Sequence, residues 1–377
     1  MSLESARRGR RWRALGACLA VLWLVVVLVG AQARAATPYI DGISDQNLPE
    51  WDGDFAHSYF ASLFRTDWVL DGHIRLARYV VQWNVMDGDY VGSRMKFEAW
   101  LRDVKQLGLS ADVGLTSYDG SYPASADEYE AALAQVLTRA RAAIGEPVEY
   151  VESWNEPNNQ GHESAPVAAR LADAAQAVCS ADFDCTVIAG DLEDAPGAAA
   201  YEEEYVRHLH FAPSIWGVHP YRSVQEMSVV PLREVVAHLP NGGVGEQLWF
   251  TEVAARTCTD YDGHLREYGE QQQAERVAWL IDTLMPYARP EHVFYYTFLV
   301  SDRRSPPCTT NEPEDEALYV PSGDPNVPDV PRSAAAYAFG GAPTPSIHTT
   351  GLAPPGSAEL LAGFLESFVG AGATVSW

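Results

Sequence analysis

Short apolar segments alternate with segments of helical periodicity along most of the chain. Each apolar segment is four to six residues long, a pattern typical of buried strands. They are Ile74–Tyr79, Ala111–Leu115, Tyr150–Trp154, Thr186–Gly190, Ile215–His219, Leu248–Thr251 and Val293–Phe298. An earlier segment, Ile40–Ser44, brings the number of predicted strands to eight.

The segments between these strands repeat apolar residues at helical spacing. Ser93–Leu107 carries its large apolar side chains on one face, and Gly108 provides a stop signal. Ser125–Glu128 forms a capping box for another helix, which should end before Gly145. Two further helices are predicted over residues 166–178 and 271–287.

This alternation predicts parallel strands joined by helical crossovers, and therefore either a closed barrel or an open doubly wound sheet. No strand is followed by the Gly-x-Gly-x-x-Gly sequence of a dinucleotide-binding open sheet. Eight strands over this length favour an α/β fold, the (β/α)8 or TIM barrel. Towards the C-terminus we expect a long loop over Pro306–Pro331, a helical segment at Ser333–Phe339 and a last helix at Leu360–Val369.

The N-terminal segment has the features of an export signal. Five arginines between Arg7 and Arg13 precede an apolar run over Leu15–Val29, and small residues follow up to Ala36. Cleavage near Ala35 or Ala36 would leave one barrel domain, residues 37–377, in a secreted or extracytoplasmic protein. The alternative is an uncleaved membrane anchor, because the apolar run approaches the shortest length that spans a bilayer.

Cysteine content and charge limit the environment and the partners. Four cysteines lie beyond the N-terminal segment, an even number that permits two disulfides in an exported chain, and we favour the pairs Cys179–Cys185 and Cys258–Cys308. The net charge is −25. So acidic a chain repels phosphate groups, which argues against nucleic acids and anionic membrane surfaces as partners.

Two glutamates stand where catalytic groups of a barrel are expected. Glu156 closes the sequence Ser153-Trp-Asn-Glu-Pro157 after the fourth strand, and Glu252 lies at the end of the seventh. Side chains at these ends meet at the C-terminal face of a barrel. Glycoside hydrolysis requires such a pair, one to protonate the leaving oxygen and one to attack or to activate water. For either residue alone, helix capping or a salt bridge with Arg78 is as good an explanation.

Trp154-Asn155-Glu156-Pro157 and Trp249-Phe-Thr-Glu252 resemble the acid/base and nucleophile motifs of clan A glycoside hydrolases of the family 5 and family 39 type. The resemblance covers roughly residues 75–298. It implies a retaining mechanism in which Glu156 is the acid/base, Glu252 the nucleophile and Asn155 a ligand of the sugar 2-hydroxyl. Retention requires the two carboxyl groups to lie roughly 5 to 5.5 Å apart.

The same resemblance gives roles to neighbouring residues. Arg78 resembles the arginine that keeps the nucleophile ionised, and His219 and Tyr221 resemble the pair that orients the nucleophile and contacts substrate. A histidine bonded to backbone and a structural arginine salt bridge remain alternatives. Many clan members carry tryptophan at the end of the eighth strand, where this chain has Tyr295-Tyr-Thr-Phe298.

Aromatic side chains near the barrel mouth are candidates for stacking on sugar rings, although each is also a normal core residue. They are Trp83, Tyr118, Trp154, Tyr221 and Tyr296.

A secreted hydrolase acting on a carbohydrate, with β-linkages favoured, is thus the leading hypothesis. The alternatives are a barrel that binds glycans without cleaving them and a transglycosidase of the cell envelope. The proposed chemistry requires no cofactor and no metal. Sequence motifs of serine hydrolases, phosphate-binding loops and zinc proteases are absent from the sequence.

Overall fold

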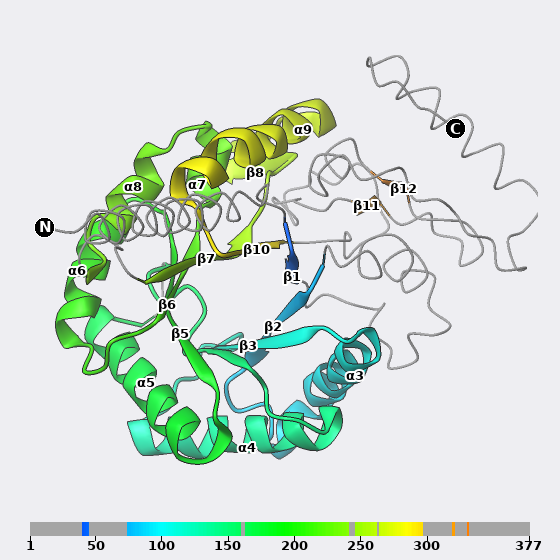
Figure 1. The fold of residues 1–377 in the computed structure, drawn as a ribbon, viewed down its shortest axis with the longest axis vertical. Coiled ribbons are helices and arrows are strands. Elements are labelled where there is room, and N and C mark those ends of the chain that lie inside the picture. The colour runs from blue at the N-terminus through cyan, green and yellow to red at the C-terminus, as the bar shows by residue number, and fades with distance from the viewer. Residues whose placement is uncertain are drawn as a thin grey trace, which may run out of the picture. The chain divides into compact units, whose positions relative to one another are not determined.

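The computed structural model describes residues 40–44, 74–159, 163–240, 246–261 and 264–296, with two short strands further on. The barrel strands are β1 (Gly42–Ser44), β2 (Leu76–Gln82), β3 (Ser110–Thr116), β4 (Tyr150–Glu152), β5 (Thr186–Glu193), β6 (Ile215–His219), β7 (Gln247–Val253) and β10 (His292–Tyr295). They form a closed barrel in the order β1-β10-β7-β6-β5-β4-β3-β2, and every pair is parallel (Figure 1). The predicted (β/α)8 barrel is confirmed.

Helices surround the barrel on its outside (Figure 1). They are α3 (Val91–Leu107), α4 (Ala126–Ile144), α5 (Ala165–Val178), α6 (Ala198–His208), α7 (Tyr221–Glu226), α8 (Val230–Val236), α9 (Gly269–Trp279) and α10 (Met285–Ala288). The predicted helices correspond to α3, α4, α5 and the α9–α10 segment. Helices α6, α7 and α8 were not predicted, because their sequences lack a long apolar stripe.

Capping residues set the ends of the predicted helices. The Ser125 side chain accepts a hydrogen bond from the Glu128 backbone N–H at the start of α4. Gly108 and Gly145 end α3 and α4 in the left-handed conformation, at φ +68° and +83°. These are the positions that the capping signals predict.

The helix expected over residues 271–287 is interrupted. A π-helical turn, Leu280–Leu284, separates α9 from α10. Pro286 lies at the start of α10 and has no backbone N–H to donate to the preceding turn. A local widening of the helix accommodates this missing hydrogen bond.

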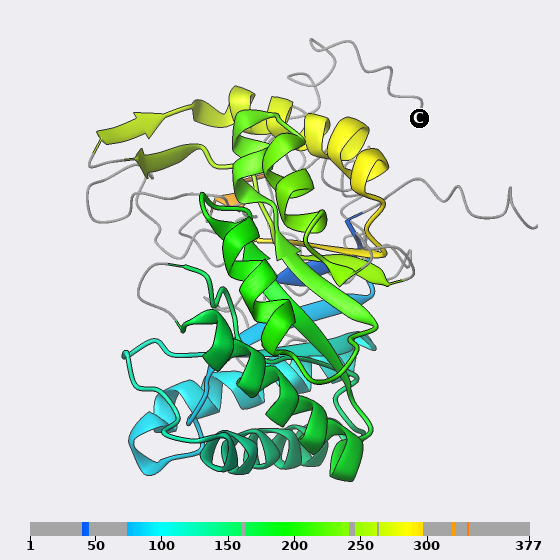
Figure 2. The same ribbon diagram turned by 90° about the vertical axis from the view of Figure 1, so that its left-hand side faces the viewer.

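Two antiparallel strand pairs lie outside the barrel. Strands β8 (Cys258–Tyr261) and β9 (His264–Glu267) form a hairpin between β7 and α9, and Figure 2 shows it projecting from the body of the barrel. Strands β11 (Tyr319–Val320) and β12 (Val330–Pro331) pair within the segment that the sequence predicts to be a long loop.

The barrel interior is divided into an apolar layer and a charged layer. Near the beginning of the strands, Leu76, Ile188, Ile215, Trp249 and Phe294 pack together as one buried cluster. Further along the strands the inward side chains are polar and fully buried, beginning with Arg78 on β2. A larger apolar core joins the outside of the strands to the helices. The apolar layer thus closes one end of the barrel beneath the charged groups.

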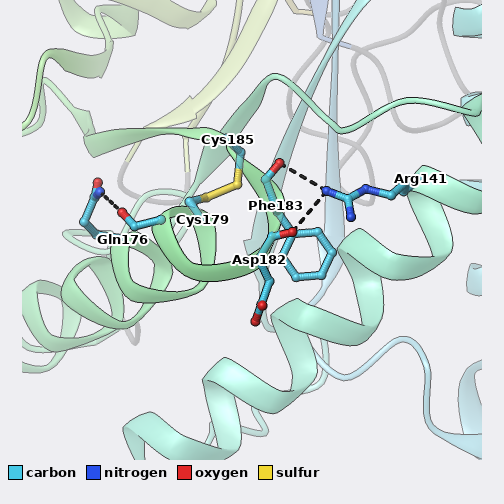
Figure 3. Close-up of a disulfide and its surroundings, with 7 residues drawn as sticks. Arg141, Gln176, Cys179, Asp182, Phe183 and Cys185 are labelled. Atoms are coloured by element: carbon cyan, nitrogen blue, oxygen red, sulfur yellow. Dashed lines mark hydrogen bonds between the residues drawn. A yellow bond between two sulfur atoms is a disulfide. The ribbon is translucent and has the colours of Figure 1, made fainter.

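A disulfide joins Cys179 and Cys185 across the turn that follows α5 (Figure 3). Arg141 of α4 donates hydrogen bonds to the backbone oxygens of Asp182 and Phe183 in the same turn, and its guanidinium lies 4.9 Å from the Phe183 ring centroid. The first predicted disulfide is therefore present, and the turn that it closes is also attached to α4.

Several predictions concern segments outside the described residues. They are the export signal over residues 1–36, the cysteine pair Cys258–Cys308, and the helical segments Ser333–Phe339 and Leu360–Val369. In the part of the chain that is described, no helix has both the length and the apolar character needed to cross a membrane.

Candidate active site

Arg78 lies at the centre of the charged layer and is completely buried. Its Nε and Nη2 atoms each donate to a different oxygen of Glu152 on β4, both at 2.6 Å. Nη1 also donates to Ser44 Oγ at 3.0 Å, and Nη2 to Asn155 Oδ1 at 2.7 Å. A two-point contact of this kind fixes the plane of the guanidinium.

The same guanidinium pairs with two further carboxylates. Nη1 donates to Glu252 on β7, and Nη2 lies 3.0 Å from Asp191 on β5. Burial alone would lower the pKa of Arg78, but the charges of Glu152, Glu252 and Asp191 raise it well above its usual value. Arg78 is therefore a permanent cation that links its own strand, β2, to β1, β4, β5 and β7.

Glu252 has a second donor on its other oxygen. The Tyr221 hydroxyl donates to Glu252 Oε2 at 2.7 Å. Tyr221 is the first residue of α7, whose start is fixed by Asp194, because that carboxylate accepts from the backbone N–H groups of Arg222 and Ser223 at 2.7 and 2.8 Å. Glu252 is thus held from both sides and is only 5% exposed.

Glu156 lies in the turn after β4, with a φ of +44° that is uncommon for a residue with a side chain. Its Oε1 is 2.8 Å from Nδ1 of His219, and the other ring nitrogen of His219 is 2.9 Å from Asp191 Oδ1. Thr251 donates to the same oxygen of Asp191 at 2.5 Å. A histidine between two carboxylates can donate from both nitrogens only when it is protonated.

The protonation states follow from these contacts. Burial alone would lower the pKa of His219, but the charges of Asp191 and Glu252 raise it to about 10. Burial raises the pKa of Glu156, yet the hydrogen bond and charge of His219 bring it below its ordinary value. At neutral pH the pair is therefore an imidazolium beside a carboxylate.

Glu156, His219 and Glu252 each offer an atom within 4.8 Å of those of the other two. Such a group could approach a metal ion, but the hydrogen bonds described above already occupy both nitrogens of His219 and both oxygens of Glu252. Two carboxyl groups at this distance can instead act on one bond of a substrate placed between them.

The structure brings together six of the predicted residues: Arg78, Asn155, Glu156, His219, Tyr221 and Glu252. The predicted aromatic platforms lie differently. Trp154 is 1% exposed and stacks on Tyr122, and Trp83 is 6% exposed with its indole N–H bonded to the Ser121 backbone. Tyr296 is partly buried against the core, whereas Tyr118 is 62% exposed. Burial leaves the two tryptophans little ring surface for a sugar.

No sequence motif gave a role to Glu152, Asp191 or Glu193. Glu152 stands inside an apolar run, where a charged residue could have indicated an inward, paired side chain. The other two follow Gly190, at which the predicted fifth strand ended, whereas β5 continues to Glu193. The continuation contains a register shift between Gly190 and Leu192, and this bulge turns Asp191 towards Arg78 and His219.

No protein-family model matches the sequence, and no curated protein matches it. Among solved structures, the chain is similar to a subfamily 18 member of glycoside hydrolase family 5 from Streptomyces cattleya in complex with GlcNAc. The TM-score is 0.53 and the identity 13%, over 80% of this chain and 79% of that one. The likeness shows the barrel fold.

Two other glycoside hydrolases are similar at lower TM-scores. One is a family 128 endo-β-1,3-glucanase from Amycolatopsis mediterranei, with a TM-score of 0.42 and 17% identity over 80% of this chain and 98% of that one. The other is a family 113 β-1,4-mannanase, at 0.47 and 12%, over 74% and 94%.

Proposed function

We propose that this protein is a retaining glycoside hydrolase that cleaves β-linked oligo- or polysaccharides, with Glu252 as nucleophile and Glu156 as acid/base. The observation that supports this most directly is the distance between the two glutamates, whose side chains offer oxygens within 4.8 Å of each other. Retaining enzymes hold their carboxyl groups about 5 to 5.5 Å apart, whereas inverting enzymes need about 6.5 to 9.5 Å to admit a water.

The contacts of each glutamate suit a different role. Glu252 faces two donors, Arg78 and Tyr221, and an anionic nucleophile is held in place by such donors. Glu156 must give a proton to the leaving oxygen and then take one from water. The proton for the first step is close by, on His219, whose Nδ1 lies 2.8 Å from Glu156. The ionised form of Glu156 is the base that the second step needs.

Substrate contacts follow from the same geometry. Asn155 accepts from Arg78 through its amide oxygen, which directs the amide N–H groups elsewhere, and we assign them to the sugar 2-hydroxyl. Export is also part of the proposal. The N-terminal segment predicts it, and the disulfide Cys179–Cys185 suits an oxidising compartment.

The first experiment incubates the protein with a panel of 4-nitrophenyl β-glycosides and with matching 2-fluoro glycosyl fluorides. We expect turnover of at least one sugar and a mass adduct on the peptide that contains Glu252. Glu252→Ala should abolish turnover. Glu156→Ala should lose about 10²- to 10⁴-fold on oligosaccharides but much less in the first step with 4-nitrophenol as leaving group. Glu204→Ala, an exposed residue of α6, is the control and should have full activity.

The outcomes separate the alternatives. Inversion of the anomeric centre, or full activity of Glu252→Ala, contradicts the retaining assignment. Equal losses for Glu156→Ala on all substrates contradict its role as acid. Transfer of the sugar to a second saccharide rather than to water indicates a transglycosidase, and binding without turnover indicates a glycan-binding barrel.

A further inference from the structure

The bulge in β5 changes which residues of this strand face the barrel opening. The register against β6 shifts between Gly190 and Leu192, and beyond the shift Glu193 pairs with His219. Asp191 is the extra residue, with φ +53°. Residues opposite each other in neighbouring strands point to the same face of a sheet. Glu193 therefore shares a face with His219, which contacts Glu156.

The backbone of Glu193 is fixed to the loop that carries Glu156. The Asn158 side chain donates to the Glu193 carbonyl oxygen at 2.7 Å and accepts from the Glu193 backbone N–H at 3.0 Å. The Glu156 backbone N–H also donates to the backbone carbonyl oxygen of Asp191 at 3.1 Å. The ends of β4 and β5 are thus held together by three hydrogen bonds, so Glu193 and Glu156 keep a constant relation.

The carboxyl group of Glu193 is available to a ligand. Its side chain is half-buried, and among the residues that the structure describes it has no side-chain hydrogen bond and no salt bridge. Burial and the charge of Glu156 raise the pKa of Glu193 to about 7, while Arg256 lowers it. This carboxyl therefore lies in the electrostatic environment of the acid/base, unlike the paired carboxylates around Arg78.

The position of Glu193 indicates which part of a substrate it would meet. Glu156 gives its proton to the oxygen of the leaving group, so the leaving-group sugar lies against Glu156. Asn155 bonds Arg78 on the nucleophile side and is assigned to the glycosyl unit, which leaves Glu193 as the neighbour of Glu156 for the leaving-group sugar. The nucleophile side is marked by Tyr221, whose hydroxyl bonds Glu252. A carboxyl group with open lone pairs binds sugar hydroxyls as an acceptor.

We propose that Glu193 is a specificity residue that binds hydroxyl groups of the sugar on the leaving-group side of the scissile bond. The inference rests on the proposed glycosidase function. It gives the enzyme a preference for substrates in which the leaving group is itself a saccharide.

The test compares two substrates with the same glycosyl unit, a 4-nitrophenyl glycoside and an oligosaccharide of four to six units. Glu193→Ala should lower kcat/KM for the oligosaccharide about 10- to 100-fold, the range for a hydrogen bond to a charged group. For the 4-nitrophenyl glycoside it should change by less than about threefold, because no sugar then occupies the leaving-group side. Glu193→Gln keeps one acceptor oxygen and should fall between, and Glu204→Ala is again the control.

Two results overturn the inference. Equal losses on both substrates mean that Glu193 acts through Glu156, and no loss on the oligosaccharide means that it binds no sugar. If the unaltered protein cleaves neither substrate, the proposed function has failed separately. Calorimetric titration of xylo-, manno-, cello-, laminari- and chito-oligosaccharides into the unaltered protein and into Glu193→Ala then tests sugar binding by Glu193. Weaker binding by the variant supports a contact between Glu193 and the sugar. Equal binding by the two proteins, or no binding by either, contradicts it.

Discussion

Asp112 is a buried carboxyl group whose charge is only partly compensated. It lies fully buried on β3, next to Glu152, whose two oxygens are already bonded to Arg78. Burial raises the pKa of Asp112 to about 7, and the charge of Arg78 lowers it only in part. In the folded protein Asp112 therefore keeps its proton at pH values where an aspartate of the unfolded chain, with a pKa of about 4, has lost it.

The sign of the pH effect follows from this difference. A raised carboxyl pKa stabilises the folded state at low pH, and this contribution is lost as pH rises from about 4 towards 7. Asp112→Asn removes the titration. We expect the Tm of the variant, relative to the unaltered protein, to increase by a few degrees between pH 4.5 and 7.5, as measured by calorimetry.

The control is Asp89→Asn, an exposed residue of the 3₁₀ turn Gly88–Tyr90. The Tm of Asp89→Asn should change with pH in the same way as the Tm of the unaltered protein. A parallel pH course for Asp112→Asn and the unaltered protein would show that Asp112 is ionised in the folded state.

At the scale of single residues, the sequence was informative where a motif named the residue. The Asn-Glu-Pro and Thr-Glu motifs indicated Glu156 and Glu252, and the structure places their side chains together. It was less informative for Glu152 and Asp191, because their roles depend on contacts with Arg78 between strands that are distant in sequence.

At the scale of elements, strands β3 and β4 fit together because Gly114 has no side chain. A Cβ at Gly114 would lie 2.5 Å from Glu152 Oε2, which is far inside contact distance. Glu152 in turn holds Arg78, and Arg78 bonds Glu252. The position of Glu252, the proposed nucleophile, thus depends on a glycine at position 114.

Gly114→Ala should therefore displace Glu152 and with it the Arg78 guanidinium. We expect a loss of at least about tenfold in kcat/KM, together with destabilisation of roughly 1 to 3 kcal/mol from overpacking. Gly92→Ala in α3 is the matched control, because nothing lies within 4 Å of its new Cβ. That variant should keep full activity and an equal or slightly higher Tm. Equal behaviour of the two variants would contradict the role of this contact.

Periodicity predicted the elements that bury a continuous apolar face and missed those that do not. All eight barrel strands and helices α3, α4 and α5 were found within a few residues of their observed bounds. The bulge in β5 was missed because Gly190 and Asp191 both resemble a strand end in sequence, although pairing with β6 continues beyond them. The β8–β9 hairpin is held by its own backbone ladder, which leaves no periodic signal.

At the scale of the whole molecule, the net charge of −25 acts against folding. Repulsion between exposed carboxylates is long-ranged at low salt, where the Debye length is about 30 Å at 0.01 M, and it shortens to about 8 Å at 0.15 M. Screening should therefore stabilise the folded protein, in contrast to the buried contacts of Arg78, which salt hardly reaches.

We expect the Tm at neutral pH to rise by a few degrees between 0.01 and 0.2 M NaCl and to level off above that concentration. A Tm that levels off indicates screening of charges, whereas exclusion of salt from the protein surface would raise the Tm steadily up to molar salt concentrations. A Tm that falls over the first interval would contradict net repulsion as the dominant surface term.

Closure of the barrel by β1 and β10 has a consequence for how the chain acquires its activity. Strand β1 pairs with β2 on one side and with β10 on the other, so the ring is completed only after residues 42–44 meet residues 292–295. Ser44 on β1 and Glu252 on β7, next to β10, both bond the same Arg78 nitrogen. Because the chain is synthesised from its N-terminus, one edge of β1 stays unpaired until β10 has been made. The ring is consequently closed last. A chain interrupted before β10 already contains Arg78 and the three carboxylates that pair with it, but it lacks the closed barrel that holds their strands together.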